Sequence, residues 1–253
     1  MKKLLIFSLI LVTTLSNAKG KTDLERYHLK GAVKSFTEEI CPEMKEKFGE
    51  MEKIKCDEEK KRYSFDKQGR LHKIETLDKN NQVKETIIAK YIYQGDKLIA
   101  KEMRNSSGKI TEKTTIKDGL EVEKIHFNNK GEIEKKLQYE YDKNGHLNKT
   151  TAFDANNKIV WMTRNENKEL KKGREVKTKF YDENGDLEDT TLSIYDEDNL
   201  FHEEYGIKKN GKRKLRMTTS YDYDDKANWV KSVQLSKIWG DLLTERKIEY
   251  YDM

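Results

Sequence analysis

The sequence is poor in proline, in long apolar runs and in clustered charge of either sign. Pro42 is the only proline among 253 residues, so no later proline interrupts the hydrogen bonding of β-strands. After the first residues, no apolar run is long enough to form a transmembrane helix. The 51 Lys and Arg residues interleave with 46 Asp and Glu residues, which leaves no basic patch for nucleic acid. We therefore predict no nucleic-acid partner and no transmembrane segment in the mature chain.

Motifs for known chemistry are also missing. There is no phosphate loop, dinucleotide fingerprint or zinc-protease motif. Asp182, Asn184 and Asp186 are spaced like calcium ligands, but Gly185 stands at the fourth position of that stretch instead of the sixth, which favours a turn. The isolated histidines have no Ser, Cys or carboxylate at a known catalytic spacing. We predict no catalytic residue, no metal and no cofactor.

The N-terminus has the pattern of a secretory signal peptide, which we assign to residues 1–18. Lys2 and Lys3 precede an apolar run from Leu4 to Val12, and Ser16-Asn17-Ala18 resembles a cleavage site. The apolar run is short for a membrane anchor. We expect export to the periplasm, the outer surface or the extracellular space.

Two cysteines, Cys41 and Cys56, follow the predicted signal peptide. In an exported protein such a pair favours a disulfide, which would contribute about 3 kcal/mol by closing a loop of this size. A zinc or redox pair is the alternative, but closer spacing or companion ligands would be needed.

A seven-residue phrase recurs along the chain: an aromatic residue, Asp or Asn, two polar residues, Gly or Asn, any residue, and an aliphatic residue. This pattern predicts a hairpin turn, because the second position can accept backbone hydrogen bonds and the fifth must adopt a positive φ. Ala227 breaks the rule at that position. The clear copies are Phe65–Leu71, Phe127–Ile133, Tyr141–Leu147, Phe153–Ile159 and Tyr181–Leu187, and looser ones are Leu77–Val83 and Tyr223–Trp229.

The first and seventh residues of each phrase are expected to pair across two strands and to share one apolar face. Between turns, Glu132 to Tyr141 alternates polar and apolar residues, which is typical of a strand with one wet face. Histidines next to the pair residues, namely His72, His126 and His146, are then expected on the solvent face.

The phrases resemble YD repeats, the tyrosine-aspartate repeats of the Rhs and teneurin families. In those families the repeats form an antiparallel sheet that rolls into a shell, and some members are linked to carbohydrate binding or to a toxin cargo. This chain is too short for such a shell, so the resemblance implies an architecture only. The residues that carry it are Tyr139, Tyr141-Asp142, Gly145, Tyr181-Asp182, Gly185, Tyr221, Tyr223-Asp224 and Asn228-Trp229.

We predict an all-β fold, a tandem antiparallel hairpin meander of YD-like repeats. The sheet is expected to form a curled single sheet, an open barrel or a half-pipe, because strand twist coils a broad sheet. Residues 19–62 form an N-terminal hairpin region with the candidate disulfide. Residues 63–253 form the repeat array, continuous with that region in one domain.

The function predicted from these features is that of an exported, non-enzymatic binding module of the bacterial cell envelope or extracellular space. Its ligand would be a carbohydrate or a protein, since repeat folds bind over extended surfaces. A scaffold element of a surface assembly and an enzyme with an unrecognised site are the alternatives. Trp161, Trp229, Trp239 and Tyr223 are the candidate ligand-binding residues, although strand parity places Trp161 and Trp229 on the apolar face, where core packing is favoured.

Overall fold

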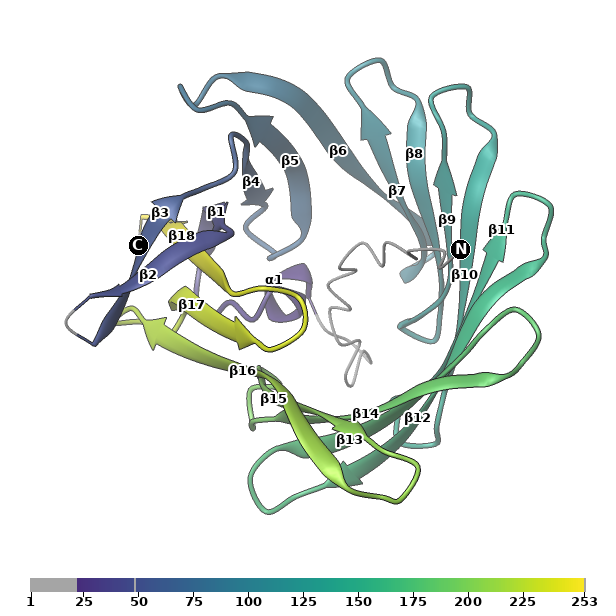
Figure 1. The fold of residues 1–253 in the computed structure, drawn as a ribbon. Coiled ribbons are helices and arrows are strands. Elements are labelled where there is room, and N and C mark those ends of the chain that lie inside the picture. Colours follow the sequence, from purple (N-terminus) through teal and green to yellow (C-terminus); the bar gives the residue numbers. More distant parts are fainter. Residues whose placement is uncertain (1–21, 48, 253) are drawn as a thin grey trace.

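A computed structural model describes residues 22–47 and 49–252, so the predicted signal peptide lies outside the described residues. This part of the chain contains one short helix, α1 (Asp23–Arg26), and eighteen strands. Sixteen of the strands form a closed antiparallel barrel (Figure 1). Within these residues, no helix has the length and hydropathy to cross a membrane.

The barrel strands follow one another as a meander. Their bounds are β1 (Val33–Cys41), β4 (Lys60–Phe65), β5 (Leu71–Leu77), β6 (Val83–Gln94), β7 (Lys97–Asn105), β8 (Ile110–Lys117), β9 (Leu120–Phe127), β10 (Ile133–Tyr141), β11 (Leu147–Asp154), β12 (Ile159–Glu169), β13 (Arg174–Tyr181), β14 (Leu187–Tyr195), β15 (Phe201–Ile207), β16 (Arg213–Tyr223), β17 (Trp229–Ser236) and β18 (Leu242–Tyr250).

The N-terminal strand closes the barrel. β1 pairs with β18 on one side and with β4 on the other, so the barrel sheet has no free edge. Phe36 of β1 stacks on Tyr63 of β4 with ring centroids 4.6 Å apart and pairs with Ile248 of β18. The prediction of an open barrel or curled sheet is corrected here, because this apolar seam joins the two ends of the meander.

A small hairpin projects from one end of the barrel. It consists of β2 (Glu43–Lys47) and β3 (Glu50–Lys55), which pair only with each other among the described strands. The predicted disulfide between Cys41 and Cys56 is confirmed and ties the hairpin to the end of β1. We call this end of the barrel the hairpin end and the opposite end, where α1 lies, the α1 end.

The recurring phrase forms the predicted turn. In the β4–β5 connection, the Asp66 amide donates to the Arg70 carbonyl, and the Gly69 amide donates to the Asp66 carbonyl. The Asp66 carboxylate accepts hydrogen bonds from the amides of Gln68 and Arg70 at 2.9 and 3.0 Å. Residues at the fifth position of the phrase have positive φ, and Ala227 keeps the same turn with a φ of 59°. An alanine in this region is strained.

Each of the predicted cross-strand pairs is also present, but a β-bulge accompanies it. Phe65 lies opposite Leu71, whereas the preceding Ser64 lies opposite Lys73, so His72 is the extra residue. Such a bulge changes which residues share a face. The pairs at the α1 end therefore face the interior, as Phe65 and Leu71 do, whereas pairs at the hairpin end face outward. Exposed aliphatic members of the hairpin-end pairs are Val83, Ile133, Ile159 and Leu187.

Candidate functional site

The interior face of the barrel is defined by the residues that contact the α1 segment. Tyr27, directly after α1, packs on Phe36, Tyr63 and Phe65, with ring centroids 5.5, 5.1 and 5.7 Å away. Directly paired residues of neighbouring strands share a face. Following such pairs from Tyr63 across every strand leads to Ile248 and back to Phe36, so one continuous face lines the interior.

Bulges correct the predicted position of several residues. Ala152 pairs with Trp161, whereas the adjacent Phe153 pairs with Ile159 across a register shift. Trp161 therefore lies on the interior face, but the Phe153–Ile159 pair faces outward, and Ile159 is 45% exposed. The prediction that all phrase pairs share one face is wrong, because counting alternate residues along each strand ignored the extra residue of the bulge at each turn.

The histidine prediction fails for the same reason. His126 pairs with the interior residue Lys135, and burial lowers the pKa of its imidazole, a shift that the nearby Glu112 opposes. His146 is only 6% exposed, with its Nε2 3.2 Å from the Glu169 carboxylate and its Nδ1 3.5 Å from Asp142. His72 alone of these three is exposed, as predicted.

The α1 segment is held in the barrel by a buried charge network. The Asp23 carboxylate accepts hydrogen bonds from the Leu71 amide at 2.9 Å, from the Lys101 ammonium at 2.8 Å, and from the Tyr91 hydroxyl. Burial alone would raise the pKa of Asp23, but Lys101 and these hydrogen bonds outweigh it, so the pKa lies below its ordinary value. Burial in turn lowers the pKa of Lys101.

Two further cations on this side of the interior have carboxylate partners. Arg26 of α1 forms an ion pair with Glu121 of β9. Arg246 of β18 forms one with Glu38 at 3.0 Å and donates to the Tyr27 carbonyl. These pairs satisfy the buried charges, which would otherwise be strongly destabilising. The side of the interior next to α1 is therefore a packed and neutralised core.

The strands from β12 to β17 form a different interior surface. Five buried side-chain polar atoms in the described residues have no hydrogen-bond partner, and four of them lie on these strands. Many interior positions here carry hydrogen-bonding or aromatic side chains. They include Trp161, Thr163, Asn165, Asn167, Arg174, Thr178, Ser193, Tyr195, Glu204, Thr219 and Tyr221. The unpartnered atoms are Asn165 Oδ1, Arg174 Nε, Thr219 Oγ1 and Trp229 Nε1, besides Arg26 Nε.

Glu204 and Gly206 show how closely this surface is packed. Burial raises the pKa of the Glu204 carboxyl, although Arg216 nearby opposes the shift. Arg216 binds Asp189 at 2.9 Å and lies across Gly206, where a Cβ would be 2.2 Å from the guanidinium Nε. A larger residue at 206 would therefore displace the Arg216 guanidinium from this position.

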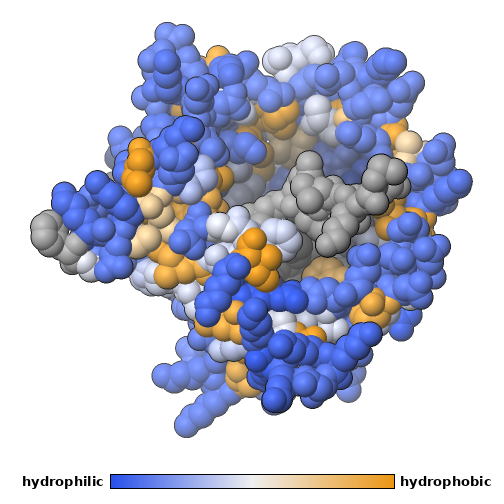
Figure 2. All heavy atoms as spheres, in the orientation of Figure 1, coloured by the Kyte–Doolittle hydropathy of each residue, from blue (hydrophilic) through white to orange (hydrophobic). Residues whose placement is uncertain are grey.

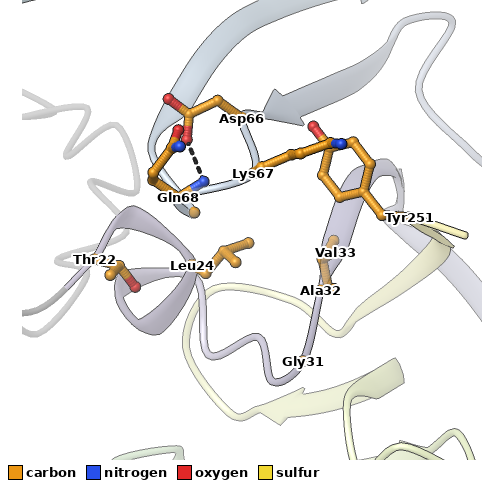
Figure 3. A pocket seen from close by; sticks show the side chains of 10 residues that line it. Thr22, Leu24, Gly31, Ala32, Val33, Asp66, Lys67, Gln68 and Tyr251 are labelled. Carbon is orange, nitrogen blue, oxygen red and sulfur yellow. Dashed lines mark hydrogen bonds between the residues drawn. The ribbon is translucent and has the colours of Figure 1, made fainter. Parts of the chain in front are cut away.

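Two hollows flank the Asp66–Gly69 turn at the α1 end. The first, of about 240 Å³, lies between α1, the start of β1 and this turn, and Leu24 and Tyr251 line it (Figure 3). The second, of about 330 Å³, is lined by Arg70, Tyr91 and Tyr93 among others. Because Arg70 already binds Asp66 at 2.7 Å, its charge is neutralised, and these hollows offer less binding chemistry than the interior.

The candidate ligand-binding residues do not form one platform. Trp161 is half-buried in the interior, and Trp229 is 8% exposed beneath the Arg246 guanidinium, 3.4 Å from its ring centroid. Tyr223 pairs with Trp229 and is 48% exposed at the α1 end. Trp239 is 57% exposed on the β17–β18 connection at the hairpin end.

One group of residues in the described chain has the spacing of metal ligands: Glu39, Cys41 and Cys56. The two sulfur atoms are bonded to each other, so this group is a disulfide beside a carboxylate. Glu39 binds Lys53 and Lys60 at 2.7 and 2.9 Å, and these lysines lower the pKa of the Glu39 carboxyl despite its partial burial.

Comparisons with known proteins identify the fold. No protein-family model and no curated protein matches the sequence. A solved porin-like protein from Bacteroides uniformis is 10% identical with a TM-score of 0.55, over 86% of this chain and 98% of that one. A porin-like protein from Bacteroides vulgatus is 14% identical, over 87% and 99% of the two chains, with a TM-score of 0.46. A LolA superfamily protein from Nitrosomonas europaea is 7% identical, over 90% and 91%, with a TM-score of 0.32. Only the first supports a shared barrel fold.

Proposed function

We propose that this chain is an exported, ligand-binding β-barrel that works in water, in the cell envelope or outside the cell, and holds a carbohydrate against its interior face. The observation that carries this proposal is the distribution of polarity across the barrel wall. The outer face is charged, whereas the inner face combines aromatic rings with unpartnered hydrogen-bonding groups.

The outer wall carries ion pairs between neighbouring strands, and Lys177 stands at the fourth of the eight residues of β13. Glu140 of β10 binds Lys149 of β11 at 2.7 Å, and Glu166 of β12 binds Lys177 and Lys179 of β13 at 3.3 and 2.6 Å. Figure 2 shows a predominantly hydrophilic surface with scattered apolar residues. A lysine facing lipid near the bilayer midplane costs about 2–4 kcal/mol. A pore function like that suggested by the name of the porin-like protein is therefore not what we propose for this chain.

The inner face between β12 and β17 has the chemistry that carbohydrate recognition needs. Sugar hydroxyls require hydrogen-bond donors and acceptors, and the apolar face of a pyranose ring packs on aromatic side chains. Asn165 and Thr219 offer unpartnered oxygen atoms, and Trp161 and Tyr221 face the same interior. Leaving such groups buried without partners costs about 1–3 kcal/mol each, so a ligand that satisfies them would be stabilising.

We further propose binding without catalysis, and membership of the YD-like repeat architecture. The turn geometry supports the second point, because Asp or Asn accepts the backbone amides of the turn and the fifth position has positive φ. The first point rests on the interior ion pairs, which neutralise Asp23, Glu38 and Glu121 and leave them as structural groups.

A carbohydrate screen tests the main proposal. We expect the purified mature chain, from residue 19, to bind members of an immobilised glycan panel saturably. Trp161→Ala is expected to lower the affinity at least tenfold, because it removes an interior stacking surface. Trp239→Ala, the same change at an exposed turn outside the interior, is expected to leave affinity unchanged. Equal loss in both folded variants, or no glycan retained by the wild type, would contradict the proposal.

A scaffold role is the second candidate, and the exposed aliphatic residues at the hairpin end favour it. Val83, Ile133, Ile159 and Leu187 occupy the same position in four turns at that end, and each is more than 40% exposed. A structural element would use this ring to contact another envelope protein. Co-purification of a partner in fixed stoichiometry, lost when Leu187 and Ile133 are changed to Ser, is the expected result for this role.

A further inference from the structure

Arg174 is the one interior arginine of the described chain without a carboxylate partner. It is the first residue of β13, directly after the turn that ends at Gly173, and it is 5% exposed. Its Nη1 donates to Asn167 Oδ1 at 2.9 Å, and its guanidinium carbon lies 5.3 Å from the centroid of the Tyr195 ring. Pairing with Tyr195 places it on the interior face.

The other interior arginines differ from Arg174 in this respect. Arg26, Arg216 and Arg246 each form an ion pair with an acidic side chain. Glu169, which lies opposite Arg174 on β12, directs its carboxylate to His146 Nε2 at 3.2 Å. A buried charge without a partner costs several kcal/mol. Glu169 and Asp142 lie near enough to attract the Arg174 charge, but both carboxylates contact His146 and neither forms an ion pair with the guanidinium. An anion bound to Arg174 would therefore be its first direct partner.

The guanidinium also has an unused hydrogen-bonding edge. Nη1 is engaged by Asn167, whereas Nε is buried and has no partner. The edge formed by Nε and the other terminal nitrogen is one that binds a carboxylate with two parallel hydrogen bonds. The charge and the free edge together point to a planar anion.

A hydroxyl-binding group belongs to the same strand pair. Asn165 and Asn167 both donate their side-chain amides to the Leu147 carbonyl, at 3.2 and 3.1 Å. This shared acceptor fixes the two side chains next to each other, and Asn165 Oδ1 is left without a donor. A free acceptor beside a free cationic edge matches a carboxylate with a neighbouring hydroxyl group, as in a sugar acid.

We propose that Arg174 is the carboxylate-binding subsite of the barrel interior, and that the ligand is an acidic saccharide whose hydroxyl donates to Asn165. This inference rests on the proposed carbohydrate-binding function and specifies its substrate class. The alternative source of the same chemistry is free phosphate, which has the charge but lacks the sugar ring.

The test has two readouts, and Arg164→Gln is the matched control. Arg164 also lies over a tyrosine ring, with its guanidinium carbon 5.9 Å from the Tyr181 centroid, but it belongs to the exposed outer face of β12. In the glycan panel, we expect acidic members to bind, Arg174→Gln to lower their affinity at least tenfold, and Arg164→Gln to leave it within twofold.

The second readout observes the arginine directly in the full mature chain. Sodium glucuronate is expected to shift the side-chain Nε–H resonance of Arg174 in a ¹H–¹⁵N spectrum, and methyl glucoside is not. Inorganic phosphate is titrated in parallel as the other source of the anion.

The outcomes separate the two proposals. If the panel shows binding of neutral glycans only, or equal binding of acidic glycans by Arg174→Gln and the wild type, the acidic subsite is wrong and the carbohydrate function stands. If no glycan binds but glucuronate and phosphate both shift Arg174, the anion subsite stands and the carbohydrate function is wrong. A response to phosphate alone overturns the sugar-acid assignment, and no response to either anion overturns the subsite.

Discussion

The two sides of the barrel interior contain similar polar and charged residues, but these residues have partners on one side and lack them on the other. Next to α1, the buried Lys101 and Arg246 have the carboxylate partners Asp23 and Glu38. On the side of β12 to β17, Arg174 has none, and the polar atoms of Asn165 and Thr219 lack hydrogen bonds. Buried polar groups are usually satisfied in native proteins. The difference indicates that one side of the interior stabilises the fold, and it is the basis of our proposal that the other side holds a ligand.

The largest loss of stability is expected when an ion pair next to α1 is broken. Asp23→Ala would leave the Lys101 ammonium buried without its carboxylate, and the loss of a partner from a buried pair costs about 3–5 kcal/mol. Urea unfolding of the mature chain measures this loss.

Asp198→Ala provides the matched control for that change. Asp198 also binds a lysine, Lys30, at 2.9 Å, but both side chains are at least half exposed. An exposed pair contributes about 0–1 kcal/mol. Similar losses for the two alanine variants would contradict the assignment of Asp23 as the buried anchor of α1.

On the side of β12 to β17, the ionisation of Glu204 is expected to make the stability of the fold depend on pH. Its pKa is raised in the folded state, so the folded chain binds the extra proton more tightly than the unfolded chain does. The stability gained from that proton is present below the ordinary glutamate pKa and is lost as pH rises through the folded value. Glu204→Gln is therefore expected to raise the melting temperature at pH 7 by roughly 2–4 °C.

The sign of that effect is checked at lower pH. Around pH 4, the Glu204 carboxyl of the folded wild type is largely protonated, so the advantage of the glutamine variant is expected to shrink. Melting curves of both proteins across this range test the point. A glutamine variant that is less stable than the wild type at pH 7 would mean that the Glu204 charge is compensated.

The smallest change in stability is expected at Ala227, in a turn of the recurring seven-residue type. Ala227→Gly is expected to stabilise the fold by up to about 1 kcal/mol, because glycine relieves the left-handed strain but loses more entropy on folding. Asn157→Gly, at the same position of another turn with a φ of 60°, is expected to gain less, since asparagine tolerates this conformation. Equal gains in stability for the two glycine variants would contradict the claim that alanine is more strained than asparagine at this turn position.

Local features of the fold could be predicted from the sequence because they depend on neighbouring residues. The seven-residue phrase specified the turn, the positive φ and the pairing of Phe65 with Leu71, and the structure contains all three. The disulfide between Cys41 and Cys56 followed from the number of cysteines and the predicted export. The phrase also occurs unrecognised at Tyr195–Phe201, where Asn199 has the positive φ.

Features that depend on distant residues could not be predicted in this way. Closure of the barrel requires Phe36 to meet Tyr63 and Ile248, and no local pattern encodes that contact. The bulges reversed the faces of Phe153 and His126, because one extra residue shifts the alternation. Arg174 was missed as a site residue, since only the arrangement of strands shows that it lacks a carboxylate.

The most direct test of the contrast between the two sides is the unfolding free energy of two matched variants, Arg246→Gln and Arg174→Gln, without ligand. Loss of Arg246 leaves Glu38 buried without its partner and is expected to cost about 3–5 kcal/mol. Loss of Arg174 removes a buried charge that has no ion-pair partner, so stability is expected to stay the same or to increase. A comparable destabilisation in both variants would contradict the account, because Arg174 would then be a structural residue like Arg246.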